Sequence, residues 1–245
     1  MTRPDTGRPP VGVLPQAAHA LAGRVARLRA APALHPRGVM CAGTLEVPGT
    51  DGGWWRAPWL DRPGSYEATV RWSRALGLPA PLPDGLGLAV RVHDADGPGS
   101  ALDLLFTSSR AGRLGRHLPL LRPHALAGPY STLVSYRAGD RARVLAAFPV
   151  PGGHGPVGAS LPALRQALAR APLRFDLRAA AADEPWRTFA TLVLTPGPPA
   201  PESGTVSYDP YAHSVPGLRP TARLSGLREA AYSGSRRGRS GRPLR

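Results

Sequence analysis

The chain has 245 residues, which is enough for one domain with a sizeable core and too few for two large ones. Its formal net charge is +15, and all 31 basic residues are arginine, because the sequence contains no lysine. The absence of lysine excludes Schiff-base catalysis and a P-loop lysine, and the single cysteine, Cys41, excludes an internal disulfide and a multi-cysteine metal site.

The predicted elements begin after residues 1–15, a Pro- and Arg-rich stretch that we expect to be disordered. Residues 17–31 are rich in Ala, Leu and Arg and favour a helix. Alternating apolar residues then predict four strands, at 37–47, 66–74, 86–94 and 101–108. The first strand contains Cys41 on its apolar face, so this residue is predicted to be a small buried side chain.

The second half of the chain continues the same pattern. Residues 130–150 are typical of a hairpin around Ala138-Gly139-Asp140, and 160–171 favour a helix with Ser160 as its N-cap. The remaining predicted elements are strands at 173–180 and 188–195 and a helix at 221–232. Because most strands are joined by short turns, we expect an α+β fold: an antiparallel β-barrel with flanking helices and a C-terminal helix.

Three polar features stand out from this framework. His35 lies at the entry to the first strand, and Arg71 and Ser73 share one face of the second. Arg228 and Tyr232 are four residues apart and share one face of the last helix. Taken singly, these features have ordinary explanations: a loop histidine, a solvated strand face, and a packing or cation–π contact on a helix.

The segments that carry these residues are LHPRGVMCAGTLEV, ATVRWSRALGLPAPLPDGLGLAVRVHD and YDPYAHSVPGLRPTARLSGLREAAYSGSRRGR. In this order they resemble the haem-dependent catalase family, in particular its small single-domain members. The resemblance implies a catalase-like haem domain over residues 16–239 with a basic tail at 240–245. It also implies that the C-terminal helix carries the haem ligand.

The resemblance implies haem b as the cofactor, with Tyr232 as the proximal ligand of its iron. Tyrosine is a known axial ligand of haem iron. A phenol has a pKa near ~10, and a guanidinium bonded to its oxygen favours the charged form, which is the role implied for Arg228. Arg71 and Arg239 match positions that bind the haem propionates, and the planar guanidinium suits a carboxylate.

On the opposite side of the haem, the resemblance implies that His35 is the acid–base residue and that Ser73 orients its ring. The family's distal asparagine position is occupied by Thr107, and the chain contains no asparagine anywhere. Asp84 matches an acidic residue near the family's substrate channel, but it is equally typical of a turn before glycine. Pro32 stands where the family has a propionate-binding arginine.

The expected function is that of a haem-dependent oxidoreductase, catalase- or peroxidase-like, acting on hydrogen peroxide or organic hydroperoxides. The alternative is a haem-binding protein with little catalysis, such as a carrier or sensor.

A nucleic-acid-binding module ranks last. The absence of Lys, Asn and Ile is typical of a GC-rich genome, and such a genome explains much of the arginine excess. With no apolar signal core and no membrane-spanning run, we expect a cytoplasmic protein whose partner is a small peroxide and that makes no membrane contact. The sequence gives no indication of the oligomeric state.

Overall fold

Alternation of apolar and polar residues sets the architecture of the barrel. The computed structural model describes residues 37–79, 82–153, 155–197 and 207–221. Eight long strands form the barrel: β1 (Arg37–Val47), β2 (Gly64–Arg74), β3 (Asp84–His93), β4 (Ala101–Ser108), β6 (Tyr130–Ala138), β7 (Arg141–Pro149), β8 (Leu173–Ala180) and β9 (Arg187–Pro196). Their apolar faces are buried and point to a common interior.

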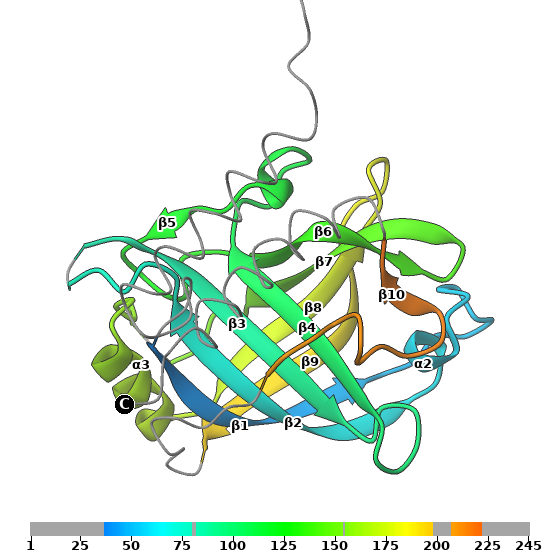
Figure 1. Cartoon of the computed structure of the whole chain (residues 1–245), viewed down its shortest axis with the longest axis horizontal. Helices are drawn as coiled ribbons and strands as arrows, with labels where there is room; N and C mark the ends of the chain where they lie inside the picture. Colours follow the sequence, from blue (N-terminus) through cyan, green and yellow to red (C-terminus); the bar gives the residue numbers. More distant parts are fainter. Residues whose placement is uncertain (1–36, 80–81, 154, 198–206, 222–245) are drawn as a thin grey trace, which may run out of the picture. The chain divides into compact units, whose positions relative to one another are not determined.

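Every neighbouring pair of strands in the barrel is antiparallel. The order is β6-β4-β3-β2-β1-β9-β8-β7, and pairing between β6 and β7 closes the ring (Figure 1). Two short strands extend it: β5 (Leu121–Arg122) pairs with the start of β3, and β10 (Leu218–Pro220) pairs with the end of β6. The antiparallel barrel predicted from the sequence is therefore confirmed.

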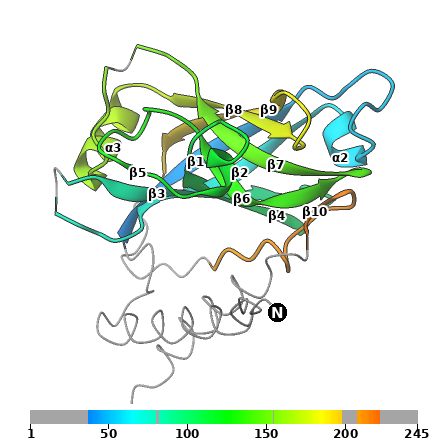
Figure 2. The same cartoon turned by 90° about the horizontal axis from the view of Figure 1, so that it is seen from above.

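The described helices are short and lie outside the barrel. They are α2 (Pro58–Asp61), the 3-10 turn η1 (Gly115–His117) and α3 (Leu161–Arg170). Figures 1 and 2 show α2 and α3 at opposite ends of the barrel. The Ser160 hydroxyl accepts a hydrogen bond from the Ala163 amide at 3.3 Å, which confirms the predicted N-cap. None of the described helices is long and apolar enough to cross a membrane.

The other predicted helices fall outside the described residues. These are the helix at 17–31 and, apart from Thr221, the helix at 221–232. The described part of the chain also contains elements that the sequence did not predict, namely α2, η1, β5 and β10. Each spans four residues or fewer, which is too short to show either a helical or a strand period.

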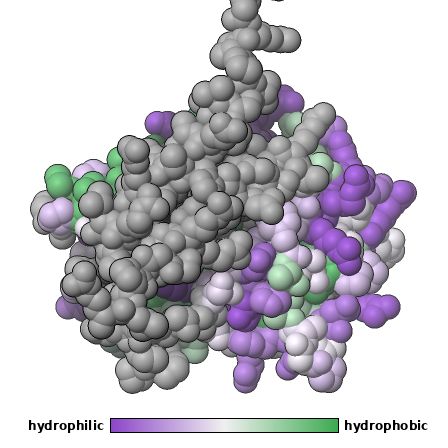
Figure 3. Space-filling view, viewed as in Figure 1, coloured by the Kyte–Doolittle hydropathy of each residue, from purple (hydrophilic) through white to green (hydrophobic). Residues whose placement is uncertain are grey.

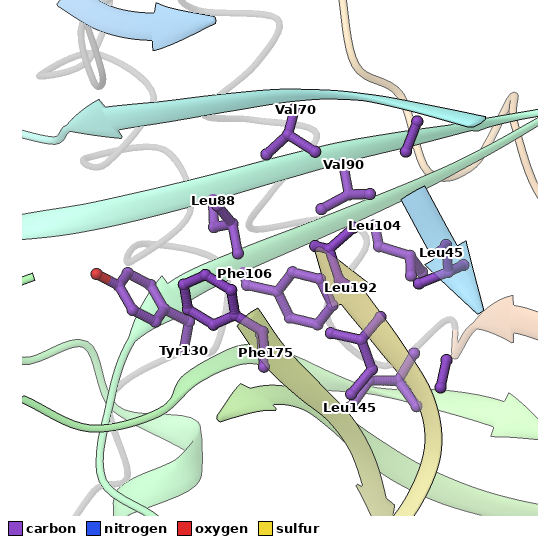
Figure 4. Packing of buried hydrophobic residues seen from close by; sticks show 14 of the residues in the cluster. Leu45, Val70, Leu88, Val90, Leu104, Phe106, Tyr130, Leu145, Phe175 and Leu192 are labelled. Carbon is purple, nitrogen blue, oxygen red and sulfur yellow. The ribbon is translucent and has the colours of Figure 1, made fainter. Parts of the chain in front are cut away.

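Side chains from opposite walls fill the barrel interior. The rings of Trp72, Tyr130 and Phe175 pack edge to face in a triad, with centroids 5.7 to 6.2 Å apart. The indole Nε1 of Trp72 donates to the Tyr130 hydroxyl at 3.2 Å, and that hydroxyl donates to the Ala125 carbonyl at 2.6 Å. Figure 4 shows Tyr130 and Phe175 facing aliphatic side chains of the β2–β4 wall. A ligand as large as a cofactor must therefore bind outside the barrel.

Cys41 belongs to this interior. Its side chain is 2% exposed, and burial raises the pKa of its thiol to about 12. The thiol is therefore protonated at neutral pH and behaves as a small apolar group, as predicted.

Candidate functional site

The outward-facing residues of β1–β4 form the surface on which the predicted site residues lie. Strand register aligns them in three rows: Gly38, Ser73, Gly87 and Thr107; then Met40, Arg71, Ala89 and Leu105; then Ala42, Thr69, Arg91 and Asp103. We call this surface the outer face. The first two rows have Gly87 and Ala89 on the central strand β3, so no long side chain projects from β3 in these rows. Four strands at their usual spacing span about 14 Å.

Ser73 and Thr107 lie in the first row, on either side of Gly87. The Ser73 hydroxyl is buried and donates to the Gly87 carbonyl at 3.3 Å. Within the described part of the chain, the Thr107 hydroxyl makes no hydrogen bond. Two strand spacings separate the two residues, or about 10 Å between Cα atoms. Two of the three residues predicted to act on substrate therefore share one row.

Arg71 lies in the second row, and its side chain extends toward Gly38 of β1. A Cβ placed on Gly38 would lie 3.1 Å from the Arg71 guanidinium carbon and 2.9 Å from the Trp72 carbonyl oxygen. Glycine at this position therefore leaves the space that the Arg71 side chain occupies. Burial lowers the pKa of Arg71, although the nearby Tyr208 acts in the opposite direction. The guanidinium remains charged at neutral pH, because arginine starts from a pKa above 12.

A buried carboxylate organises the third row. Asp103 is fully buried and accepts two hydrogen bonds from Arg91, at 2.8 and 2.7 Å. It also accepts the Asp209 amide at 2.7 Å and contacts the His213 Nδ1 at 2.8 Å. These bonds, with those to Ser207 and Tyr208, hold residues 207–213 across β2–β4, where Figure 1 shows the orange segment crossing the strands.

The same carboxylate has a perturbed pKa. Burial by itself would raise the pKa of Asp103, but hydrogen bonds from Arg91, His213 and the Asp209 amide outweigh burial and lower it below its usual range. The adjacent Tyr208 ring lies 5.3 Å from the Arg91 guanidinium carbon. Burial raises the pKa of Tyr208 to about 12, so its hydroxyl is neutral at pH 7.

This cluster is the part of the site that sequence reasoning missed. Arg91 and Asp103 each occupy a polar position of a predicted strand, which is a visible signal. Their contact depends on the register between β3 and β4, and the contact with His213 joins residues 110 positions apart. Neither relation follows from local periodicity.

Asp84 has a structural role in the fold. Its carboxylate is fully buried and accepts the backbone amides of Leu76 and Leu78 at 2.8 and 3.1 Å. The Nε of Arg74 lies 3.3 Å from the same carboxylate. These contacts hold the loop before β3, which supports the turn interpretation of Asp84.

The remaining predicted site residues lie outside the described residues. They are His35, Arg228, Tyr232 and Arg239. Among the residues that the structure does describe, no three His, Cys, Asp or Glu side chains converge on a point where a metal ion would fit. The described part of the site is therefore one surface, bearing Arg71, Ser73 and Thr107.

Comparison with known proteins identifies the fold. No protein-family model matches the sequence, and no curated protein matches it. Among solved structures, a bacterial catalase superimposes with a TM-score of 0.61 at 12% identity, covering 98% of this chain and 62% of that one. Catalase A from Saccharomyces cerevisiae gives 0.58 at 12% identity, covering 84% and 60%. This chain thus has a catalase-like fold and spans about three fifths of each of those chains.

We predict that Asp103→Asn destabilises the protein by about 3 kcal/mol at pH 7, because it removes the buried charge that pairs with the partly buried Arg91. A folded-state pKa below the unfolded value near ~3.9 stabilises the protein above that pH, and this contribution is lost as the pH falls through the folded pKa. Urea unfolding of the wild type and of Asp103→Asn should therefore give a difference in the free energy of unfolding that becomes smaller as the pH is lowered into the acid range.

The matched control is Asp140→Asn, because Asp140 forms an exposed ion pair with Arg56 in which both side chains are at least half exposed. Its loss should change the free energy of unfolding by no more than about 0.5 kcal/mol. Equal effects of the two substitutions, or a difference at Asp103 that does not change with pH, would contradict the proposed role of the buried carboxylate.

Proposed function

We propose that this protein is a haem-dependent oxidoreductase that acts on hydrogen peroxide or organic hydroperoxides. The observation that carries the proposal is the outer face: Arg71, Ser73 and Thr107 lie on one face of a catalase-like barrel whose interior is filled. The resemblance to the haem-dependent catalase family implies roles toward haem and peroxide for the same three residues.

The described residues fit one side of a planar tetrapyrrole. Glycine and alanine in the middle of the outer face leave room for a flat ring, and no bulky side chain interrupts the rows at Gly87 and Ala89. The Arg71 guanidinium, held over Gly38, would pair with a propionate. Arg239 would provide a second propionate partner.

Tyr232 and Arg228 would hold the other side of the haem. The phenolate of Tyr232 would bind the iron, and Arg228, one helical turn before it, would favour the phenolate over the phenol. When bound, the haem iron supplies the redox chemistry that cleaves the O–O bond. An anionic oxygen ligand favours ferric iron, which suits peroxide chemistry better than reversible oxygen binding.

Ser73 would determine the direction of proton transfer. Its hydroxyl already donates to the Gly87 carbonyl, so toward a further partner its oxygen acts as an acceptor. It would therefore accept a ring N–H from His35 and leave the other ring nitrogen as the base. That nitrogen would take a proton from the peroxide and return it to the departing oxygen, which leaves as water or an alcohol.

Thr107 sets the expected rate. A threonine hydroxyl is one rotating donor, whereas an amide side chain offers two donors fixed by a planar group. Loss of one preorganised donor costs roughly 10²–10³ in rate in other enzymes. Slow peroxidase activity or hydroperoxide rearrangement therefore fits this surface better than rapid catalase turnover. The same feature favours the second candidate function, a haem carrier or sensor.

We predict that the protein made with ample haem shows an intense Soret band with the absorption pattern of phenolate-ligated ferric iron. Tyr232→Phe should alter or abolish this spectrum, since phenylalanine offers the iron no oxygen. The control is Tyr211→Phe, which changes an exposed tyrosine in the same way and should leave the spectrum intact. A folded but colourless wild-type protein would refute the proposal.

We also predict that Thr107→Asn raises the rate of peroxide decomposition by about 10²-fold, because it supplies a fixed amide donor in the row that contains Ser73. The Soret spectrum should be retained, so the rate per haem is the quantity to measure. Ser73→Ala in the Thr107→Asn background should remove most of the gain. An unchanged rate in a haem-loaded Thr107→Asn protein would show that Thr107 does not face the peroxide.

A further inference from the structure

Two loops that meet at β5 carry most of the large exposed hydrophobic side chains among the described residues. Among the described residues there are seven large exposed hydrophobic side chains, and five of them are leucines of these loops: Leu76, Leu82, Leu114, Leu118 and Leu121. Leu114 is the most exposed, at 83%, and Leu118 follows at 62%. A soluble monomer rarely gathers exposed leucines in one place without a binding role.

The two loops are neighbours in the fold. One joins β2 to β3, and the other runs from the end of β4 through η1 to β5. Pairing of Leu121 with Gly85, and of Arg122 with Asp84, brings them together at the start of β3. In Figure 3 hydrophobic atoms gather at the left edge of the molecule, where Figure 1 draws β5 and the β2–β3 loop. We call this surface the leucine rim.

Buried arginines hold the leucine rim in place. Arg122 donates to the Ser109 carbonyl, and Arg116 packs over the Trp186 ring, 4.9 Å from its centroid. The Trp186 indole in turn donates to the Ala111 carbonyl at 2.9 Å. The leucines are therefore presented by an anchored loop, which lowers the entropic cost of binding.

The charges of the leucine rim are all of one sign. Arg110 and Arg113 are exposed beside the leucines, and the sequence has no acidic residue between Asp103 and Asp140. In the other loop the carboxylate of Asp84 is buried against Arg74. The adjoining β8–β9 turn brings Asp183 and Glu184, but both pair with arginines of β7.

We propose that the leucine rim is a docking surface for an anionic lipid membrane. Exposed leucines surrounded by arginines match the headgroup boundary, where apolar side chains enter the acyl layer and guanidinium groups meet phosphates. A second copy of the chain fits less well, because a self-complementary contact would face Arg110 and Arg113 with their own copies. The proposal differs from the expectation, drawn from the sequence, that the chain makes no membrane contact, and the vesicle experiment decides between them.

The test is sedimentation of the full chain with vesicles. Phosphatidylcholine vesicles containing phosphatidylglycerol should carry the protein down, and pure phosphatidylcholine vesicles should not. Because a net charge of +15 attracts the chain to anionic vesicles without any apolar contact, the decisive variant keeps the charge unchanged. Leu114→Ser combined with Leu118→Ser should weaken partitioning by about tenfold or more.

The matched controls lie away from the leucine rim. Tyr211→Ser removes an exposed apolar side chain elsewhere and should leave partitioning unchanged. The charge variant of the leucine rim is Arg110→Glu with Arg113→Glu. Its control is Arg137→Glu with Arg219→Glu, at the β6–β10 pair, which changes the net charge by the same amount. The rim variant should weaken vesicle binding more than the control. Undiminished binding of the leucine variant would overturn the proposal. So would self-association of the wild-type chain that the leucine variant abolishes, with no binding to vesicles.

Discussion

The packing of Trp72, Tyr130 and Phe175 inside the barrel is the constraint on which the rest of the structure depends. The three rings come from β2, β6 and β8, so their contacts join opposite walls. The hydrogen bonds through Tyr130 leave the Trp72 indole and the Tyr130 hydroxyl satisfied in the apolar interior. With the interior filled in this way, only the outside of the barrel remains for a ligand, and the strands become a wall that presents side chains outward.

The arrangement of residues on the outer face depends on the register of the strands and on two different sets of contacts. The row of Ser73, Gly87 and Thr107 is aligned by backbone pairing and by the hydrogen bond from Ser73 to the Gly87 carbonyl, whereas the third row is fixed by the buried Asp103. Asp103 binds both Arg91 within the sheet and residues 207–213 beyond it. The stretch of chain that precedes Arg228 and Tyr232 in sequence is therefore tied to the strands that carry Arg71 and Ser73.

Much of this could be predicted from the sequence, for physical reasons. A period of two identifies a strand with one buried face, which is why the eight long strands and the shared face of Arg71 and Ser73 were found. The same period cannot tell which strands are neighbours or how they are offset, so the Arg91–Asp103 pair was missed. Elements of four residues or fewer, such as α2 and β10, carry no period at all.

Haem titration of Ala89→Trp tests most directly the proposal that haem binds over the outer face. Ala89 lies between Arg71 and Leu105 in the middle row, so an indole there would occupy the space proposed for the ring. The control is Ala142→Trp, at an exposed position of β7 on another part of the barrel. Wild type and Ala142→Trp should bind haem, and folded Ala89→Trp should not. Haem binding by Ala89→Trp with wild-type affinity would contradict the proposal.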